Sequence, residues 1–315
     1  MITTVTANPS LDRTLRLPRF VAGEVNRATS TLVEPSGKGV NVALALHGVG
    51  VPVRAVLPVG GGTGDEIVTL LDDFGLEHVG VPIGGALRSN VTLVEADGRT
   101  SKINEPGPRL SDSEVEALCA AALSAGEAGD WVVWSGSLPD GFRPHRLAAA
   151  VTEAREAGRR VAVDCSGAPL AAVLEAATVP DLVKPNADEL AEVTNRSLRT
   201  LGDVIEAAGL LRARGVHTVL VSLGADGALL HGPDLPEPVH GSAPARRVVN
   251  TAGAGDAFLA GWLAAAHAGA SSVEAFAGAL RFGAAAVEHG GTLLGVPDPR
   301  RRVSIAPARP ETPLS

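Results

Sequence analysis

The chain has 315 residues and a formal net charge of −8, with 45% apolar and 20% charged residues. This length can bury a large core, as one α/β domain or two smaller ones, and the composition is ordinary for a globular protein. The acidic balance and the lack of a basic, aromatic-lined face argue against nucleic acid as a partner, although local cations could still hold an anionic substrate.

Membrane association and disulfide chemistry are not expected either. No window of the sequence approaches the length of an apolar membrane span, and residues 1–5 do not resemble the start of a signal peptide. Cys119 and Cys165 stand apart in apolar surroundings, so two buried free thiols are expected in place of a disulfide or a metal site. The expected compartment is the cytoplasm.

Apolar runs of strand length alternate along the chain with Ala- and Leu-rich stretches of helical period. The expected strands are residues 2–7, 53–59, 91–96, 131–135, 161–164, 182–184, 218–222 and 228–230. The expected helices are residues 40–47, 64–74, 112–124, 144–157, 187–193, 201–214, 256–268 and 272–289. From about residue 130 the strands are apolar on both faces, which predicts a parallel sheet covered by helices on both sides.

Two other segments, residues 9–35 and 86–106, alternate polar and apolar positions without a helical period. Such strands bury one face only, so they predict a small sheet over one end of the main domain, a candidate lid. The tail, residues 300–315, is rich in proline and arginine and is expected to be loose. No linker or repeat divides the chain, so residues 1–315 are expected to form a single domain.

The clearest chemical signal is Thr251-Ala252-Gly253-Ala254-Gly255-Asp256-Ala257, which leads directly into an apolar helical segment. Small residues at a helix start can aim several backbone N–H groups at one anion, and the helix dipole adds positive charge there. An aspartate beside that anion can accept the proton of an attacking hydroxyl, a combination typical of phosphoryl transfer. The alternative is a glycine-rich turn whose aspartate complements the helix dipole.

A second glycine-rich segment, Ser36-Gly37-Lys38-Gly39-Val40-Asn41, opens another expected helix. Two glycines around a lysine expose backbone donors and one cation, which could hold a phosphate or sugar hydroxyls; the alternative is a flexible turn with a solvated lysine. The sequence contains no Walker A motif and no complete dinucleotide-binding fingerprint, so neither would hold a nucleotide.

Polar groups also follow the expected parallel strands, where open α/β sheets bind ligands. They are Ser135-Gly136-Ser137, Asp164, Lys184-Pro185-Asn186 and Ser222-Leu223-Gly224-Ala225-Asp226-Gly227. The last segment suits a nucleotide wall or an ordinary turn between strands. Asn186 and Glu189 have capping-box spacing, which would explain both, and a carboxylate there could also hold a magnesium-bound water.

The candidate lid carries further polar residues. Arg88, Asn90 and Lys102 lie on its expected strands, where the two cations could clamp a substrate phosphate or serve as edge-strand charges. Asp12, after Asn8-Pro9-Ser10, could bind sugar hydroxyls or close a turn. The eight histidines show neither triad nor metal-ligand spacing.

Taken together, these motifs resemble the ribokinase-like carbohydrate kinases, the PfkB family, over nearly all of residues 1–295. The segment 36–41 with Gly60-Gly61 is similar to the family's first signature, and Asn250-Thr251-Ala252-Gly253-Ala254-Gly255-Asp256 is similar to its second. Segments 6–12, 87–91, 103–107, 135–139, 183–186 and 221–224 resemble the phosphosugar branch, which contains 1-phosphofructokinase and tagatose 6-phosphate kinase. Gly-Lys-Gly at 37–39 and Asn-Glu-Pro-Gly at 104–107 favour that pair over fructose 6-phosphate kinase.

The resemblance implies a three-layer α/β/α fold with a mostly parallel sheet and a β-sheet lid, often shared across a homodimer. It implies ATP- and Mg²⁺-dependent phosphorylation of a ketohexose monophosphate, with fructose 1-phosphate converted to fructose 1,6-bisphosphate. The alternatives are tagatose 6-phosphate or fructose 6-phosphate, a kinase of an unphosphorylated sugar or a nucleoside, and a non-catalytic sugar-phosphate sensor.

The resemblance also implies roles for individual residues. Asp256 would be the general base, with the amides of Gly253, Ala254 and Gly255 as the anion hole. The implied substrate-binding residues are Asp12, Gly37, Gly39, Asn41, Asn90 and Ser137, with Lys38, Arg88 and Lys102 on the substrate's phosphate. The implied ATP-binding residues are Lys184, Asn186, Ser222, Leu223, Gly224, Ala225, Asp226, Gly227 and Gly255, with Asn186 and Glu189 near magnesium. Two departures are Asn250, where relatives often have Asp, and His289-Gly290-Gly291, where relatives often place Asn beside adenine.

Overall fold

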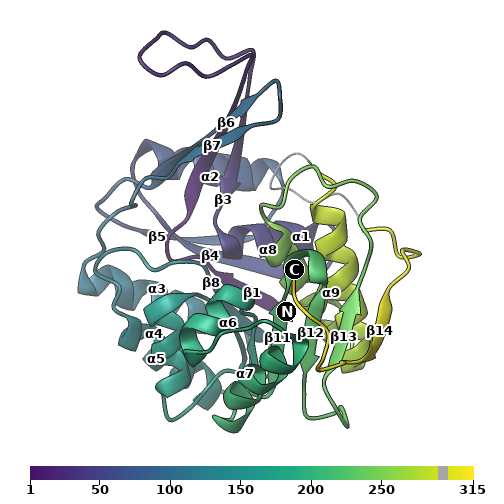
Figure 1. Cartoon of the computed structure of the whole chain (residues 1–315). Coiled ribbons are helices and arrows are strands. Elements are labelled where there is room, and N and C mark those ends of the chain that lie inside the picture. The colour runs from purple at the N-terminus through teal and green to yellow at the C-terminus, as the bar shows by residue number, and fades with distance from the viewer. Residues whose placement is uncertain (290–296) are drawn as a thin grey trace.

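The structure, a computed structural model, describes residues 1–289 and 297–315. Within these ranges the largest feature is a ten-stranded sheet with the spatial order β14-β13-β12-β11-β10-β9-β8-β1-β4-β5 (Figure 1). Its strands are β1 (Ile2–Val5), β4 (Val53–Val59), β5 (His78–Pro82), β8 (Trp131–Ser135), β9 (Arg160–Asp164), β10 (Leu182–Val183), β11 (Thr218–Ser222), β12 (Ala228–His231), β13 (Val239–Ser242) and β14 (Ser304–Pro307). The strands from β11 to β5 run parallel, and β12, β13 and β14 add an antiparallel edge.

Helices cover both faces of this sheet (Figure 1). One face carries α3 (Asp112–Ser124), α4 (Pro144–Glu156), α5 (Gly167–Glu175), α6 (Ala187–Thr194) and α7 (Leu201–Ala213). The other carries α1 (Lys38–His47), α2 (Gly61–Asp73), α8 (Ala254–His267) and α9 (Ser272–Ala286). None of these helices has the length and apolar character needed to cross a membrane, as far as the described residues go. The predicted three-layer α/β/α architecture is confirmed.

The two apolar cores follow from the alternation of side chains along the strands. In β8, Val132 and Trp134 join the core under α3–α7, whereas Trp131 and Val133 join the core under α1, α2, α8 and α9. Successive residues of a strand point to opposite faces, so a strand buried on both sides must be apolar throughout. That is why strands such as β8 and the middle of β9 appear in the sequence as apolar runs.

A separate four-stranded sheet stands out from the main body, with the order β3-β2-β6-β7 (Figure 1). Its strands are β2 (Ser10–Leu17), β3 (Ser30–Ser36), β6 (Arg88–Glu95) and β7 (Thr100–Ile103). Three of them lie within the two segments, residues 9–35 and 86–106, whose alternation predicted half-buried strands, and β3 extends one residue beyond the first segment. The central pair, β2 and β6, is parallel, so the first residues of both strands, Ser10 and Arg88, lie side by side. We call these four strands the small sheet.

The expectation of a loose tail is wrong for its central part. Residues 304–307 form β14 and pair antiparallel with β13, and the carbonyl of Pro310 accepts a hydrogen bond from the Gly202 amide. Proline is compatible with the outermost strand of a sheet, where an amide is not needed on the open side. The partner strand, β13, lies far upstream in the sequence, so the composition of the tail alone does not indicate this pairing. Strands β5 and β13 and helix α5 were also not predicted.

Candidate active site

Helix α8 begins at the second glycine-rich signature. Its N-cap residue, Gly253, has a φ of 76°, a left-handed conformation that favours glycine, and the first residue of the helix is Ala254. The amide of Ala254 donates to the Thr251 carbonyl at 3.3 Å. Within the described part of the chain, the amides of Gly253, Gly255 and Asp256 make no hydrogen bond. Two of the three predicted anion-hole amides are therefore free to bind an anion at the positive end of the helix.

Asp256 lies in the first turn of α8 and is only 6% exposed. Its Oδ2 accepts a hydrogen bond of 2.7 Å from the Nδ2 of Asn41 on α1. Burial, reinforced by the negative charge of Asp164, raises the pKa of Asp256 to about 6, against the opposing effects of Asn41, Lys38 and Lys184. The carboxylate is thus ionised at neutral pH and basic enough to take up a proton.

An ionic cluster lies close to this carboxylate. Asp164 ends β9 and is fully buried, and its Oδ1 is 3.0 Å from the Nζ of Lys38 and 3.3 Å from the Nζ of Lys184. Lys38 Nζ is also 3.7 Å from Oε1 of Glu189. Burial lowers the pKa of Lys38, but the carboxylates of Asp164 and Glu189 outweigh it and raise the pKa above its usual value. Lys38 therefore stays charged beside the start of α8.

Lys184 is the residue of this cluster that meets α8. A Cβ placed on Gly255 would lie 3.4 Å from the Lys184 Nζ, so the ammonium group stands next to the free Gly255 amide. Lys184 is 3% exposed and follows β10 directly. Asp164 joins Lys38 and Lys184, and the sequence marks it as a polar strand end without indicating this role. Its position after an apolar parallel strand was the only sequence signal available for it.

The glycines of the first signature serve close packing. A Cβ on Gly37, whose φ is 120°, would come within 2.6 Å of the Thr6 side chain, and a Cβ on Gly39 would come within 2.9 Å of the Val5 carbonyl oxygen. The start of α1 therefore lies directly against the end of β1. This approach brings Lys38 and Asn41, on the first turn of α1, to the Asp164 cluster and to Asp256.

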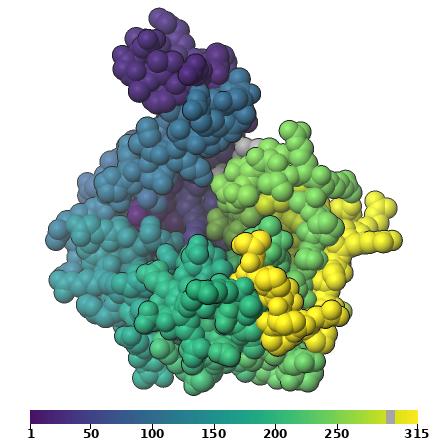
Figure 2. Space-filling model, viewed as in Figure 1, coloured from purple at the N-terminus to yellow at the C-terminus, as the bar shows by residue number. Residues whose placement is uncertain are grey.

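The predicted sugar-binding residues meet where the small sheet joins the main sheet. Asp12 on β2 stands opposite Asn90 on β6, and Asn90 Nδ2 donates to Asp12 Oδ1 at 3.0 Å. Arg88 donates from Nη2 to the Asn8 carbonyl at 3.0 Å, and Asn8 Nδ2 donates to Ser137 Oγ at 3.2 Å. Figure 2 shows a recess between the small sheet and the main body, with N-terminal residues at its floor.

Lys102 is not brought into this group. It is exposed on β7, opposite Thr92, and its side chain makes no hydrogen bond or ion pair with any residue that the structure describes. Its predicted contact with a substrate phosphate remains a prediction. His289 is exposed next to the end of α9, and Gly290 and Gly291, the rest of the segment expected near adenine, lie outside the described residues.

The predicted nucleotide loop adjoins Lys184 and Asn186. Ser222 ends β11 and its amide donates to the Pro185 carbonyl at 3.1 Å, and Gly224 and Gly227 both have positive φ around the short turn of Gly224–Asp226. The side chains of Leu223 and Ala225 add no polar group to this loop. Asp226 Oδ2 accepts hydrogen bonds of 2.8 Å from the amide and hydroxyl of Ser315, so its carboxylate binds the C-terminus of the chain.

Asn186 and Glu189 form the capping box that their spacing predicted. Asn186 Oδ1 accepts from the Glu189 amide at 2.8 Å, and Glu189 Oε2 accepts from the Asn186 amide at 2.9 Å. This local role leaves Oε1 of Glu189 facing Lys38. The same residues can therefore cap α6 and present one carboxylate oxygen to the Asp164 cluster.

Known proteins share both the sequence and the fold. Residues 5–299 match the pfkB family of carbohydrate kinases. The 1-phosphofructokinase of Vibrio cholerae is 34% identical over 261 residues, 82% of this chain and 81% of that protein. The 1-phosphofructokinase of Rhodobacter capsulatus is 36% identical over 308 residues, 97% and 95% of the two chains. Escherichia coli phosphofructokinase-2 in complex with fructose-6-phosphate superposes with a TM-score of 0.85 at 33% identity over 91% of this chain and 93% of that one. The family resemblance carried by the two glycine-rich signatures is confirmed, and the chain belongs to the pfkB family of carbohydrate kinases.

Proposed function

We propose that this protein is an ATP-dependent kinase that converts fructose 1-phosphate to fructose 1,6-bisphosphate. The observation that carries the proposal is the buried Asp256 carboxylate, with a pKa raised to about 6, in the first turn of a helix whose Gly253 and Gly255 amides are free. The similarity to 1-phosphofructokinases over most of both chains supports the choice of substrate. ATP as phosphoryl donor favours the cytoplasm as the compartment.

In the proposed reaction, the sugar 6-hydroxyl attacks the γ-phosphorus of ATP and its proton passes to Asp256. The bond from the γ-phosphorus to the bridging oxygen breaks, and ADP leaves with that electron pair. Asn41 holds the Asp256 carboxylate in place through its 2.7 Å hydrogen bond. Phosphoryl transfer needs little covalent help, so positioning and charge stabilisation supply most of the acceleration.

The transferred group would be stabilised at the start of α8. The amides of Gly253 and Gly255, with the ammonium of Lys184 beside residue 255, supply the positive charge. Ala254 contributes less than expected, because its amide already donates to Thr251. Lys38 is better placed for this group than for the substrate's own phosphate, since it pairs with Asp164 and Glu189.

Arg88 is the candidate for the phosphate that the substrate brings with it. It is half-buried at the base of the small sheet, and it donates to the main-chain carbonyl of Asn8, whose side-chain amide donates to Ser137 Oγ. Asp12 and Asn90, paired across β2 and β6, would bind sugar hydroxyls between this arginine and Asp256. A ligand without a phosphate would bring no anionic group to Arg88, which disfavours an unphosphorylated sugar or a nucleoside.

The carboxylates fit a magnesium ion carried by the ATP phosphates. No group of three or more acidic, histidine or cysteine side chains among the described residues forms a metal site of its own. Asp164 Oδ2 is buried without a hydrogen-bond partner, and Glu189 Oε1 faces the same cluster. Mg²⁺ uses one or two carboxylates and otherwise keeps waters and phosphate oxygens. When bound with ATP it would neutralise phosphate charge, held through Glu189 and Asp164, with Asn186 positioning Glu189.

The small sheet would act as a lid over the recess, and a homodimer would join two such sheets. Its strands and the loop at their tip expose several apolar side chains, and such exposed apolar groups mark a surface that binds a partner. They are Phe20, Val21, Val25, Leu32 and Ile103. A second copy of the chain covering these residues would bury them and exclude water from the site.

An assay of ADP release tests the proposed function. Purified protein with MgATP is given fructose 1-phosphate, tagatose 6-phosphate, fructose 6-phosphate or fructose, and the highest kcat/KM is expected for fructose 1-phosphate. A higher kcat/KM for one of the other phosphosugars would make that sugar the substrate, and the proposed ATP-dependent phosphorylation would stand. Phosphosugars that raise the melting temperature without ADP release would instead identify a sensor.

A further inference from the structure

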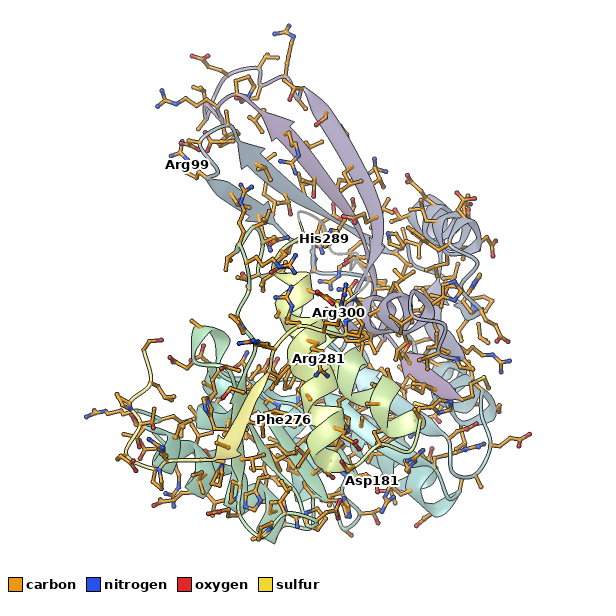
Figure 3. The ribbon with its side chains drawn as sticks, turned by 90° about the vertical axis from the view of Figure 1, so that its right-hand side faces the viewer. Arg99, Asp181, Phe276, Arg281, His289 and Arg300 are labelled. Atoms are coloured by element: carbon orange, nitrogen blue, oxygen red, sulfur yellow. The ribbon has the colours of Figure 1, made fainter. Side chains whose placement is uncertain are left out.

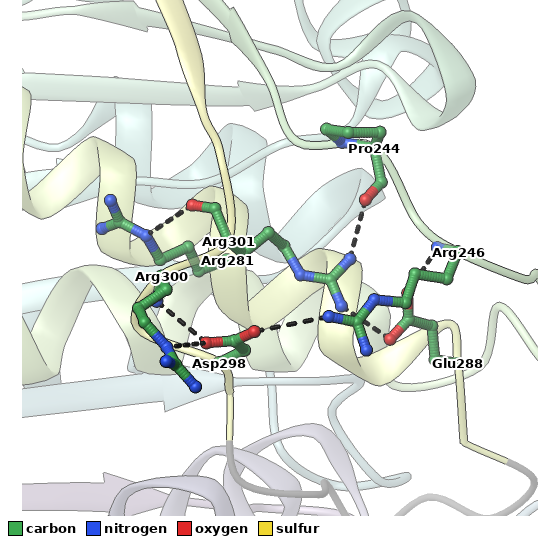
Figure 4. A network of polar contacts seen from close by, with 7 residues as sticks. All are labelled: Pro244, Arg246, Arg281, Glu288, Asp298, Arg300 and Arg301. Carbon is green, nitrogen blue, oxygen red and sulfur yellow. Dashed lines mark hydrogen bonds and ion pairs between the residues drawn. The ribbon is translucent and has the colours of Figure 1, made fainter.

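A cluster of arginines lies apart from the site described above, beside the end of α9. Two segments form it: residues 244–246, which follow β13, and residues 298–302, which precede β14 (Figure 4). They line an open cavity of about 260 Å³. Figure 3 shows Arg281 and Arg300 on the face of the molecule where α9 lies.

Arg301 forms the fixed part of this cavity. Its side chain is 8% exposed, and it donates from Nη1 to the Pro244 carbonyl at 2.7 Å and from Nη2 to Glu288 Oε2 at 2.6 Å (Figure 4). Arg281 holds its backbone from the other side, with a hydrogen bond of 3.2 Å to the Arg301 carbonyl. The buried Nε of Arg301 has no hydrogen-bond partner in the described part of the chain. A donor thus remains unused in an otherwise rigid group.

The rim of the cavity has an excess of positive charge. Arg246 and Arg300 have side chains 81% and 92% exposed, and they share one carboxylate, Asp298, at 3.4 Å and 3.8 Å. Arg302 is exposed and makes no ion pair with a described residue. Such long, exposed pairs contribute little, and they leave most guanidinium donors free. Four arginines here face two carboxylates, on a chain whose overall charge is −8.

A second arginine-lined cavity, of about 280 Å³ between α4 and β9, serves as a comparison, because its arginines have structural roles. There Arg155 pairs with Asp181 at 2.6 Å, and Arg160 donates to the Gly129 carbonyl at 3.0 Å while it lies 4.7 Å from the ring of Trp131. Both arginines have fixed partners at short distance. Arg300 and Arg302 do not, so the cavity near α9 differs in having exposed, weakly paired cations around the buried Arg301.

We propose that this cavity is a binding site for a small phosphate anion, with Arg246, Arg300 and Arg302 on its oxygens and Arg301 at its base. The planar guanidinium group matches phosphate oxygens in pairs, and charge-assisted hydrogen bonds of this kind are stronger than neutral ones. The cavity is smaller than the usual site for a drug-sized ligand, which favours one or two phosphoryl groups over a whole nucleotide. None of these arginines belongs to the proposed catalytic machinery, so this site does not depend on the proposed function.

Calorimetric titration of the full chain with inorganic diphosphate at low ionic strength tests the proposal. The informative variant is Arg300→Gln/Arg302→Gln. The matched control, Arg143→Gln/Arg214→Gln, removes two exposed arginines that make no ion pair with the described residues. One class of sites should weaken at least about tenfold in the first variant and stay unchanged in the second, since each lost charge-assisted bond costs that much. Any binding at the catalytic centre is common to all three proteins and cancels in the comparison.

Equal affinity in the two double variants, or no binding by the wild-type protein beyond a class that both variants retain, would overturn the proposal. A parallel titration with glycerol 2-phosphate identifies the source of the anion. Arginine-dependent binding of both probes supports the phosphoryl end of a larger metabolite as ligand, and arginine-dependent binding of diphosphate alone supports the free ion. Unchanged melting temperatures without ligand verify that the variants fold.

Discussion

Asn41 on α1 donates a 2.7 Å hydrogen bond to the Asp256 carboxylate on α8, across 215 positions of sequence. The two residues come from the two glycine-rich signatures, one at the start of each helix. Helices α1 and α8 pack side by side against the same face of the main sheet, and this packing makes the contact possible. The bond favours the ionised form of this carboxylate and so opposes burial, which favours the protonated form.

Replacing Asp256 by Asn separates its catalytic role from its effect on stability. Without a base, kcat for fructose 1-phosphate should fall by about 10²–10⁴-fold while KM changes little. The carboxyl has a pKa of 3.8 unfolded and about 6 folded, so its contribution to stability is complete below pH 4 and is lost as the pH rises through 6. At pH 8 the folded protein must therefore hold an ionised carboxylate in a buried position, which costs free energy. Asp256→Asn removes this charge and should raise the free energy of unfolding at pH 8 by up to about 3 kcal/mol.

Urea unfolding at pH 8 and at pH 4 measures the stabilisation by Asp256→Asn, which should be present at pH 8 and absent at pH 4. Wild-type turnover in the variant would contradict the role of Asp256 as general base. The same difference in unfolding free energy between variant and wild type at both pH values would contradict its raised pKa.

The pH dependence of kcat/KM should show an acidic limb near pH 6, where Asp256 becomes protonated. Asn41→Ala removes the hydrogen bond that favours the charged form, so the pKa of Asp256 should rise by roughly 0.5–1 unit and the limb should move to higher pH. The measurement is a pH–rate profile of both proteins at subsaturating sugar. A lower rate with an unmoved limb would mean that Asn41 only orients the site.

Asp164→Asn should destabilise the protein and impair activity. The change leaves the buried ammonium of Lys184 and that of Lys38 without their shared carboxylate, and breaking a buried ion pair costs about 3–5 kcal/mol. Adding Lys184→Met to Asp164→Asn should recover part of the stability, because one unpaired charge is then gone, but none of the activity. Additive losses in a double-mutant cycle would show that the two groups do not interact.

Close packing of α1 against β1 predicts a contrast between two glycines. Gly39→Ala places a Cβ within 2.9 Å of the Val5 carbonyl oxygen and should cost about 1–3 kcal/mol. Gly62→Ala, in the first turn of α2, meets nothing within 4 Å and should be neutral or stabilising by up to about 1 kcal/mol. Thermal unfolding of both variants checks the contrast, and equal melting temperatures would rule out tight packing at residue 39.

Much of the fold could be predicted from the order of residues alone. Apolar strands such as 131–135 and 161–164 identified the parallel sheet, because only a sheet covered on both faces tolerates side chains that are apolar throughout. The capping box of Asn186 and Glu189 was predicted from spacing, since both hydrogen bonds lie within one turn. The edge strand β14 was not, because its pairing partner β13 lies far along the chain. The short strand β5 was not, because His78–Pro82 has only one buried position and so shows no apolar run.

The sequence by itself determined which chemical groups are present and which segments start helices, because caps, glycines and apolar period act over a few residues. It did not determine that Asp164 lies between Lys38 and Lys184, that Lys102 stands apart, or that Ala254 has lost its free amide. The pKa of Asp256 likewise depends on α1, β9 and β10 meeting at the start of α8. Those properties arise from distances and burial between remote segments, which only the packed tertiary structure decides.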